Sequence, residues 1–328
     1  MQKYKNKIVC GDCIDLLGKV KTPFVDLVFA DPPFNIGYKY DKYKDVVKSQ
    51  KYISWTKDWM AACVNVLKPT GSFYIAIGDD YAAHVRLIGE ELGLTMRNWI
   101  IWHYTFGQQT KTKFARAHTH IFYFVKDTGE FTFNDYAVRV PSDRQLIYND
   151  KRSNPRGKMP DDVWNEFPRV CGTFYERQRW HPCQMPESLL TRIVSVSSNT
   201  GDLVLDPFNG SGTTVAVAQK LKRDYCGFDI SDDYVKNTIK RLADQKKEKP
   251  FKTIHGQLDS GEILELRRLY IDIGIETRDI LNSKKLLGIF TQQFSVRMNN
   301  NKEYDSDLIA AAIAKIRPGP EPSKRKYK

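Results

Sequence analysis

The sequence lacks the features of a membrane or secreted protein. It has no run of about 18 apolar residues, and its mean hydropathy is −0.50, so we expect no membrane-spanning helix. The opening residues, MQKYKNKIVC, contain no apolar segment of the kind found in secretory signals. We therefore predict a cytoplasmic protein without a membrane partner.

Disulfide bonds and metal clusters are also not expected. The six cysteines lie far apart along the 328 residues, which is unlike a small disulfide scaffold and favours a reduced, cytosolic setting. Cys10 and Cys13 have the C-x-x-C spacing of redox and zinc sites, but no second pair of this kind follows. The sequence therefore predicts no metal site.

Acidic residues are in the minority. The 51 Lys and Arg residues against 39 Asp and Glu give a formal net charge of +12, and the pI is about 9.2. Such an excess favours an anionic partner, of which nucleic acid is the first to consider. Solubility alone is the other explanation of this charge.

Strands and helices alternate in two blocks. Continuous apolar runs such as 25–30 are typical of strands covered by helices on both faces, and stripes such as Trp55 and Trp59 predict helices. The runs 96–104 and 119–125 have no long helix between them, so we expect an antiparallel pair. The alternation predicts an α/β fold with a mostly parallel sheet. Further strands are expected at 6–12, 68–78, 201–208 and 224–230, and helices at 52–67, 81–93, 186–198, 211–221 and 231–247.

A glycine turn in the second block has the pattern of a nucleoside site. A strand ends at Asp206, the turn Gly210-Ser211-Gly212 follows, and a helix begins near Thr213. Glycine lets the backbone approach a ligand, and a helix N-terminus offers free N–H groups and a positive dipole end. Asp229 ends the next strand, at the distance typical of an acid that binds ribose hydroxyls.

This turn lacks the third glycine of G-x-G-x-x-G, the pattern of dinucleotide sites. The ligand is therefore expected to contain a nucleoside without a pyrophosphate. S-adenosylmethionine meets this description, with adenosine for the acid and an amino-acid part for the turn. An ordinary tight strand–helix turn is the alternative.

The first block carries the second notable motif, Asp31-Pro32-Pro33-Phe34. The prolines end the ladder of hydrogen bonds and fix the backbone, so the strand stops abruptly. Taken alone, this motif is also compatible with a rigid loop that carries a solvated acid.

Together the two motifs resemble those of the amino-group DNA methyltransferases, which use S-adenosylmethionine to methylate an exocyclic nitrogen of adenine or cytosine. DPPF matches their catalytic motif (D/N/S)-P-P-(Y/F/W), and Phe208 to Gly212 match their cofactor motif F-x-G-x-G. The catalytic motif comes first, as in the circularly permuted β group. The run HPCQMPESLLTRIV resembles the segment upstream of the cofactor strand, although Met185 replaces a frequent lysine. The resemblance covers roughly residues 7–245.

The resemblance implies a Rossmann-like class I methyltransferase fold. Its sheet has seven mostly parallel strands, and the last two form an antiparallel hairpin. Asp31 and the Pro32 carbonyl would accept hydrogen bonds from the target amine, Pro33 would hold that carbonyl, and Phe34 would stack on the flipped base. Asp12 is expected near the cofactor's adenine, with a solvated loop acid as the alternative. The implied cofactor-binding residues are Asp12, Asp31, His181, Gln184, Asp206, Phe208, Asn209, Gly210, Ser211, Gly212, Thr213 and Asp229.

The resemblance also implies where double-stranded DNA is recognised. The β group places its target-recognition region at an insertion that corresponds to 104–180, inside a catalytic domain of residues 1–248. Basic residues beside Gln, Asn and aromatic side chains suit phosphate and base contacts, although such runs are also common on solvated surfaces. The candidates are Lys111, Lys113, Arg116, Arg152 and Arg156.

Residues 249–328 form the second predicted unit, a helical extension with a basic tail. Helices are expected at 260–274 and 305–317, and no motif assigns them a role. They are open to three roles: recognition, dimerisation or binding of a partner. A homodimer, a cognate restriction enzyme and a place on the nucleoid of a prokaryote or phage all remain open at this point.

The expected product is N6-methyladenine. Asp at the first motif position and the following Asn35-Ile36-Gly37 resemble adenine enzymes. N4-methylcytosine is the main alternative, because both amines require the same geometry. An RNA methyltransferase is disfavoured by the motif order, and an inactive DNA-binding homologue by the intact Asp31 and glycines.

Overall fold

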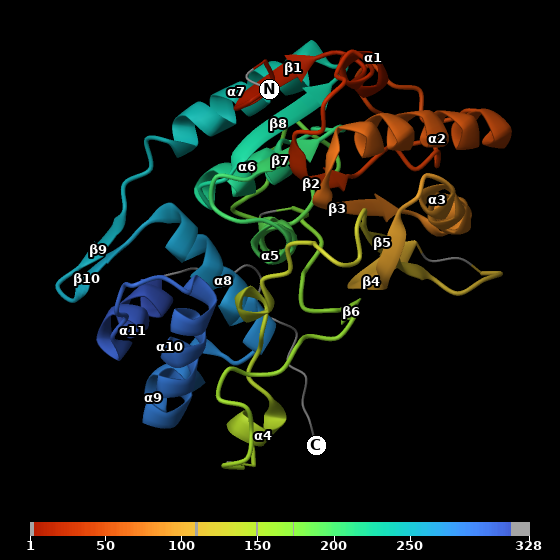
Figure 1. Cartoon of the computed structure of the whole chain (residues 1–328). Coiled ribbons are helices and arrows are strands. Elements are labelled where there is room, and N and C mark those ends of the chain that lie inside the picture. Colours follow the sequence, from red (N-terminus) through yellow and green to blue (C-terminus); the bar gives the residue numbers. More distant parts are fainter. Residues whose placement is uncertain (1–2, 109–110, 149, 173, 316–328) are drawn as a thin grey trace.

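The structure is a computed structural model and describes residues 3–108, 111–148, 150–172 and 174–315 (Figure 1). Its centre is an eight-stranded sheet in the order β1-β8-β7-β2-β3-β5-β4-β6. The strands are β1 (Lys7–Cys10), β2 (Val25–Ala30), β3 (Leu67–Ile77), β4 (Thr95–Gln108), β5 (Arg116–Val125), β6 (Val163–Trp164), β7 (Leu203–Asp206) and β8 (Asp224–Asp229).

The strand directions confirm the mostly parallel sheet. Strands β1, β8, β7, β2 and β3 run parallel, and β5 is antiparallel to both of its neighbours, β3 and β4. The expected antiparallel hairpin is therefore present as β4 and β5. The number of seven strands was one too few, because β6 adds a parallel edge strand beside β4. It has only two residues, too few to give a periodic signal.

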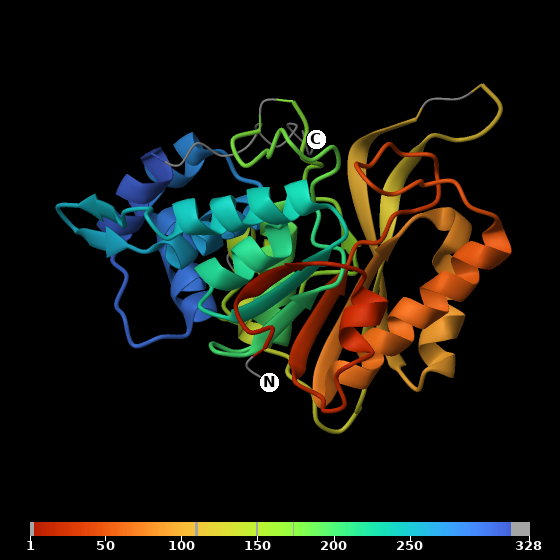
Figure 2. The same cartoon turned by 90° about the horizontal axis from the view of Figure 1, so that it is seen from above.

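Helices cover both faces of the sheet, as Figure 2 shows. On one side lie α1 (Cys13–Leu17), α2 (Ser49–Val66) and α3 (Asp79–Glu91), and on the other α5 (Glu187–Ser197), α6 (Thr213–Lys220) and α7 (Asp232–Gln245). Strand β2 shows why both layers form. Val28 and Ala30 belong to the apolar cluster under the first layer, and Leu27 and Phe29 to the cluster under the second.

The C-terminal elements form a third apolar cluster, drawn in blue at the lower left of Figure 1. The expected helices near 260–274 and 305–317 correspond to α8 and α11, whereas α9 and α10 were not predicted. The tail after residue 315 lies outside the described residues. The elements are β9 (Phe251–Thr253), β10 (Gly256–Leu258), α8 (Ser260–Ile273), α9 (Thr277–Asn282), α10 (Lys284–Met298) and α11 (Ser306–Lys315).

The predicted insertion at 104–180 has two parts. Its first part belongs to the sheet, since it includes the end of β4 and all of β5. The rest is mostly irregular, with η1 (Asp135–Ala137), α4 (Asp143–Leu146) and β6 as its regular elements. No helix in the described part of the chain is long and apolar enough to cross a membrane.

Candidate active site

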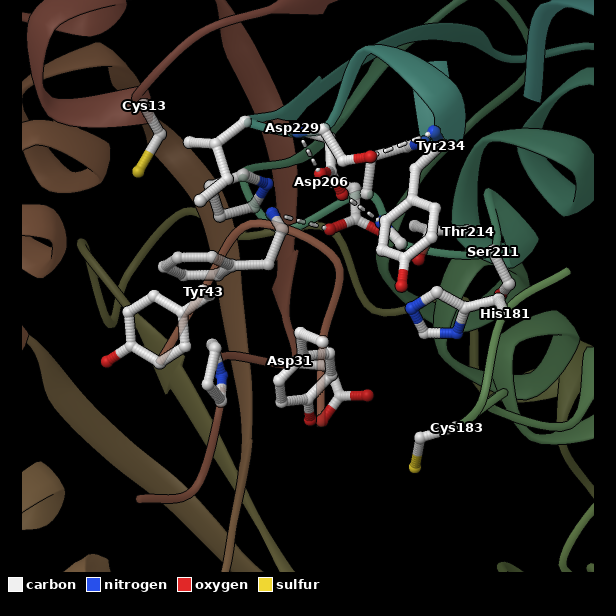
Figure 3. Close-up of a pocket in the computed structure, with 18 of the residues that line it drawn as sticks. Cys13, Asp31, Tyr43, His181, Cys183, Asp206, Ser211, Thr214, Asp229 and Tyr234 are labelled. Carbon is white, nitrogen blue, oxygen red and sulfur yellow. Dashed lines mark hydrogen bonds between the residues drawn. The ribbon is translucent and has the colours of Figure 1, made fainter. Parts of the chain in front are cut away.

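A cavity lies at the carboxyl ends of β1, β2, β7 and β8, where open α/β sheets bind ligands (Figure 3). Its empty volume is about 1020 Å³, including the open mouth. Because parallel strands end at one edge, residues from both sequence blocks meet here. The predicted residues that line it are Asp12, Asp31, Pro33, His181, Asp206, Phe208, Asn209, Gly210, Ser211, Thr213 and Asp229.

Two carboxyl groups from neighbouring strands face this cavity. Desolvation raises the pKa of Asp31 to about 7, the charge of Asp206 adds to the rise, and Arg169 opposes it. Desolvation likewise raises the pKa of Asp206 to about 7, against a hydrogen bond from Thr214. Both groups therefore change their protonation near neutral pH, which is the range in which proton-accepting groups of active sites operate.

The diproline turn after β2 is held from below. The Tyr52 hydroxyl donates a hydrogen bond of 2.5 Å to the Pro33 carbonyl. Phe34 is partly buried against the apolar cluster, and its ring approaches Gly78 so closely that a Cβ there would lie 3.2 Å from Phe34 Cδ2. Among the described residues that line the cavity, neither Pro32 nor Phe34 occurs. In this structure Phe34 therefore packs under the motif, because Gly78 leaves room for its ring.

The glycine turn meets Asp229 and His181. Gly210 has a φ of 45°, and its N–H donates a hydrogen bond of 2.7 Å to Asp229 Oδ2. A Cβ at Gly210 would lie 2.9 Å from His181 Nε2, so only glycine fits without displacing that ring. Gly212 lies behind the cavity, where a Cβ would come within 2.5 Å of Thr238.

Gln184 has a structural position rather than a place in the cavity wall. Its Oε1 accepts a hydrogen bond of 2.7 Å from the Gln178 N–H, and its Nε2 donates to the Glu176 carbonyl at 2.9 Å. It thereby fixes the chain that leads to His181. Gly212 and Gln184 are the two predicted cofactor residues that the described cavity lining does not include.

Sequence reasoning missed an aromatic wall. Tyr40, Tyr43, Trp55 and Tyr234 also line the cavity, and the ring centroids of Tyr234 and His181 are 4.8 Å apart. Burial lowers the pKa of His181 to about 4, so this ring is neutral at physiological pH. The aromatic spacing in YKYDKY was a signal that could have identified the loop after Phe34.

Asp45 organises that loop over the cavity. It is 2% exposed, and its carboxylate accepts hydrogen bonds from the backbone N–H groups of Asn35, Ile36 and Tyr38 at 2.7, 3.2 and 2.9 Å. Lys42 then pairs with Asp232 at 2.6 Å, which joins the loop to the start of α7. A buried acid of this kind fixes a loop through donors that would otherwise need water.

The predicted DNA-binding residues fall into two separate groups. Lys111, Lys113 and Arg116 belong to the β4–β5 hairpin, whereas Arg152 and Arg156 follow α4, and Figure 1 shows these elements far apart. The groups differ in availability. Arg116 pairs with Asp79 at 3.1 Å and Asp80 at 2.8 Å, and Arg152 pairs with Asp150 at 3.0 Å.

One cluster has the composition of a metal site. Ligand atoms of Asp79, His118 and His120 lie within 4.8 Å of one another. However, Trp99 Nε1 donates a hydrogen bond of 2.9 Å to His120 Nδ1, so neutral His120 carries its proton on Nε2. That nitrogen lies 3.4 Å from Asp79 Oδ1 and acts as a donor. The cluster is a hydrogen-bonded support of the hairpin.

The chemistry of the cavity fits S-adenosylmethionine. Asp229 offers carboxylate oxygens for hydroxyl groups, the aromatic wall offers flat apolar surfaces, and the turn at Gly210 leaves a space that a side chain would fill. Beside them, Asp31 offers an acceptor. The fold and the cavity together define an α/β enzyme that uses a nucleoside cofactor.

Comparison with known proteins identifies the family. Residues 25–241 match the family model of N6/N4 methyltransferases, described as DNA methylase. The chain is 40% identical over 245 residues to DNA adenine methyltransferase YhdJ of Escherichia coli K12, covering 72% of this chain and 82% of that protein. It is 36% identical over 239 residues to Type II methyltransferase M.HpaI of Haemophilus parainfluenzae, covering 72% and 74%. The chain therefore belongs to the N6/N4 DNA methylase family.

Solved structures of low sequence identity show the same fold. PvuII DNA methyltransferase (cytosine-N4-specific) aligns with a TM-score of 0.55 at 18% identity, covering 82% of this chain and 96% of that one. A DNA modification methylase of Thermus thermophilus, complexed with S-adenosyl-L-methionine, aligns with a TM-score of 0.54 at 21% identity, covering 73% and 93%.

Proposed function

We propose that this DNA methyltransferase transfers the methyl group of S-adenosyl-L-methionine to the exocyclic N6 of adenine in duplex DNA. One observation carries the proposal. Asp31 from the first block lines the same cavity as Gly210 and Asp229 from the second, so an acceptor for the amine lies beside a nucleoside site. Bound S-adenosylmethionine supplies an electrophilic methyl group on a sulfonium sulfur.

The residues of this chain hold and orient the two reactants. Asp229 binds ribose hydroxyls, and the N-terminal end of α6 with its glycine turn binds the amino-acid part. The aromatic wall encloses the adenine, and Asp12 lies at its edge. The full set is the one named from the sequence, apart from Gln184 and Gly212, which support the site from behind.

Asp31 prepares the nucleophile. An exocyclic amine is weak because its lone pair is delocalised into the ring, and acceptors on its hydrogens favour a pyramidal nitrogen. The ionised Asp31 carboxylate and the Pro32 carbonyl are these acceptors, and the Tyr52 bond to Pro33 keeps the turn rigid. Because Phe34 packs beneath the motif, Tyr40 and Tyr43 are better placed to stack on the flipped base.

Two observations favour adenine over cytosine. The motif begins with Asp31 rather than serine, and the relative at 40% identity is named a DNA adenine methyltransferase. N4-methylcytosine is the second candidate, because PvuII DNA methyltransferase, which is cytosine-N4-specific, has a similar fold. The order of motifs, catalytic before cofactor, further supports the permuted β group, with a target-recognition region between them.

The product decides between the two bases. Duplex DNA treated with the enzyme and S-adenosylmethionine is digested to nucleosides and analysed by mass spectrometry, with Asp31→Ala as the control. N6-methyladenine that depends on Asp31 is the expected result. N4-methylcytosine in its place would overturn the adenine assignment and keep the methyltransferase.

The relatives support a role in restriction and modification. Three of them at 33–36% identity are named Type II methyltransferases. A cognate restriction enzyme would then cut the same site when it is unmethylated, and a cytoplasmic, nucleoid-associated location follows from the DNA substrate. Dimerisation is a separate proposal that sedimentation of the free protein would test.

A further inference from the structure

A closed loop follows η1 in the polar part of the chain. Val140 and Lys158 form an antiparallel bridge with two N–H···O bonds of 2.9 and 2.8 Å, and this bridge closes the neck of the loop. Arg139 Nη1 crosses the same neck and donates to the Gly157 carbonyl at 3.0 Å. Residues 141–148 and 150–157, which lie beyond the neck, are called the recognition loop below.

The recognition loop exposes side chains that suit a nucleic acid. Tyr148 is 73% exposed and Ile147 is 67% exposed, although both are large and apolar enough to be buried. The side chain of Arg152 is 85% exposed even with its partner Asp150, and Arg156 is also exposed. Exposed aromatic rings beside guanidinium groups match stacked bases and phosphates rather than a folded core.

Helix α10 holds the neck of this loop from the C-terminal region. Gln293 is 2% exposed, and its Nε2 donates to the carbonyls of Arg139 at 3.1 Å and Arg156 at 3.3 Å. Arg297 Nε adds a bond of 2.9 Å to the Arg139 carbonyl. One side chain therefore ties both strands of the neck to the same helix.

The packing at this point leaves no freedom. Gly157 has a φ of 84°, and a Cβ there would lie 2.8 Å from Gln293 Oε1 and 2.4 Å from the Val140 carbonyl. Glycine is required both by the backbone conformation and by the close approach of α10. At the far side of the loop, Lys285 Nζ lies 3.5 Å from the Leu146 carbonyl at the end of α4.

A buried ion network anchors α10 in turn. Arg297 Nη1 pairs with Glu265 of α8 at 3.1 Å, and Glu265 also pairs with Arg268 at 2.7 Å. Arg268 then donates to the Ala137 carbonyl in η1, just before the neck. The C-terminal helices and the polar segment are thus joined through buried charges, which are costly to separate.

We infer that Gln293 and Arg297 are positioning residues that set the recognition loop for contact with duplex DNA, so the C-terminal helices take part in target recognition. This inference rests on the proposed DNA methyltransfer. Its physical basis is preorganisation. A loop that is already fixed at its neck loses less conformational entropy on binding, so more of the contact energy appears as affinity.

The matched pair Gln293→Met and Gln292→Met tests this inference. Methionine keeps the length of the side chain but cannot donate, and Gln292 is the exposed neighbour on the same helix. We expect Gln293→Met to raise the KM for DNA about tenfold, the effect of losing two hydrogen bonds. The kcat at saturating DNA, the Kd for S-adenosylmethionine and the parameters of Gln292→Met should stay at wild-type values.

Transfer of radioactive methyl groups to unmethylated bacterial DNA measures these constants, whichever base is modified. A wild-type enzyme that modifies no DNA would refute the proposed function. An active wild type with an unchanged KM in Gln293→Met would refute only the inference. Hydrogen exchange of the recognition loop should also be faster in this variant.

A second pair of changes keeps the test decisive if Gln293→Met is unstable. Tyr148→Ala with Arg156→Ala removes exposed side chains and leaves the neck bonds in place. We expect the KM for DNA to rise, and the combination with Gln293→Met to be less than additive, because all three act through one loop. An unchanged KM in the double variant would overturn the inference.

Discussion

At the scale of single residues, the Asp31 carboxyl combines two opposing requirements. Accepting hydrogen bonds from an amine requires its ionised form, whereas its surroundings favour the neutral form and raise its pKa to about 7. Few mutations should therefore alter the pH dependence of this enzyme as much as those at Asp31.

The rate of methyl transfer should rise with pH through about 7. We expect kcat/KM to increase about tenfold per pH unit below this value and to level off above it, because only ionised Asp31 accepts both hydrogens. Steady-state rates between pH 5.5 and 9 check this, with Asp31→Asn as the comparison. The variant should be slow, and its profile should lose this dependence; an identical profile would exclude Asp31 as the titrating group.

The same group should lower stability at alkaline pH. Between the ordinary Asp pKa of 3.8 and the folded value of about 7, the folded protein binds more protons than the unfolded chain, so stability falls as pH rises. Asp31→Asn should therefore be more stable than wild type at pH 8, by roughly 3 kcal/mol at most. Near pH 4 the two proteins should unfold alike. Thermal unfolding without cofactor measures the difference, and equal unfolding at pH 8 would contradict it.

At the scale of elements, the turn between β7 and α6 depends on contacts from three other segments. Asp229 of β8 holds Gly210, His181 closes over it, and Arg241 of α7 donates to the Ser211 carbonyl at 2.8 Å. Arg241 also pairs with Glu187 at 2.7 Å. Burial would raise the pKa of Glu187, but Lys220 and Arg241 hold it below its ordinary value. The turn is thereby joined to α5.

Gly210→Val should abolish binding of S-adenosylmethionine. A branched side chain at a φ of 45° is strained, and its Cβ would collide with His181 Nε2. Gly201→Val is the control, because Gly201 has a φ of 85° and no atom within 4 Å of the added Cβ. Calorimetry should show binding in the control only. Wild-type affinity in folded Gly210→Val would refute the role of this turn.

At the scale of the whole molecule, net charge and local pairing have different consequences. The formal charge of +12 implies that DNA affinity falls steeply with salt, because bound phosphates release counterions. Only unpaired cations contribute fully to this effect. Arg116 is engaged by Asp79 and Asp80, and its pKa is raised by the hydrogen bond to Asp80.

Two variants of the β4–β5 hairpin should separate these cases. Lys111→Ala removes an exposed lysine, and we expect the slope of log affinity against log salt to decrease by about one. Arg116→Ala should change this slope little, because the variant also frees two carboxylates. Fluorescence anisotropy with labelled duplex DNA at several salt concentrations measures both slopes. Equal changes in the two variants would contradict the pairing seen here.

The sequence by itself determined the order of elements and the two motifs. Apolar runs such as 25–30 and the glycine turn at Gly210 depend on local chemistry, so they were predictable, and the α/β class followed from their alternation. The meeting of Asp31 with Asp229 was also predictable, because parallel strands end at one edge of a sheet. For the same reason most of the predicted cofactor residues line the cavity.

Only the tertiary structure decided which side chains face inward and which are already paired. Phe34 packs against Gly78, Gln184 fixes a loop, and Arg116 is paired with two acids, although each looked functional in the sequence. Likewise, Gln293 meets Arg139 and Arg156 across more than 130 residues of chain. Such contacts leave no periodic signal, because they depend on the distance between surfaces that the chain brings together only when it folds.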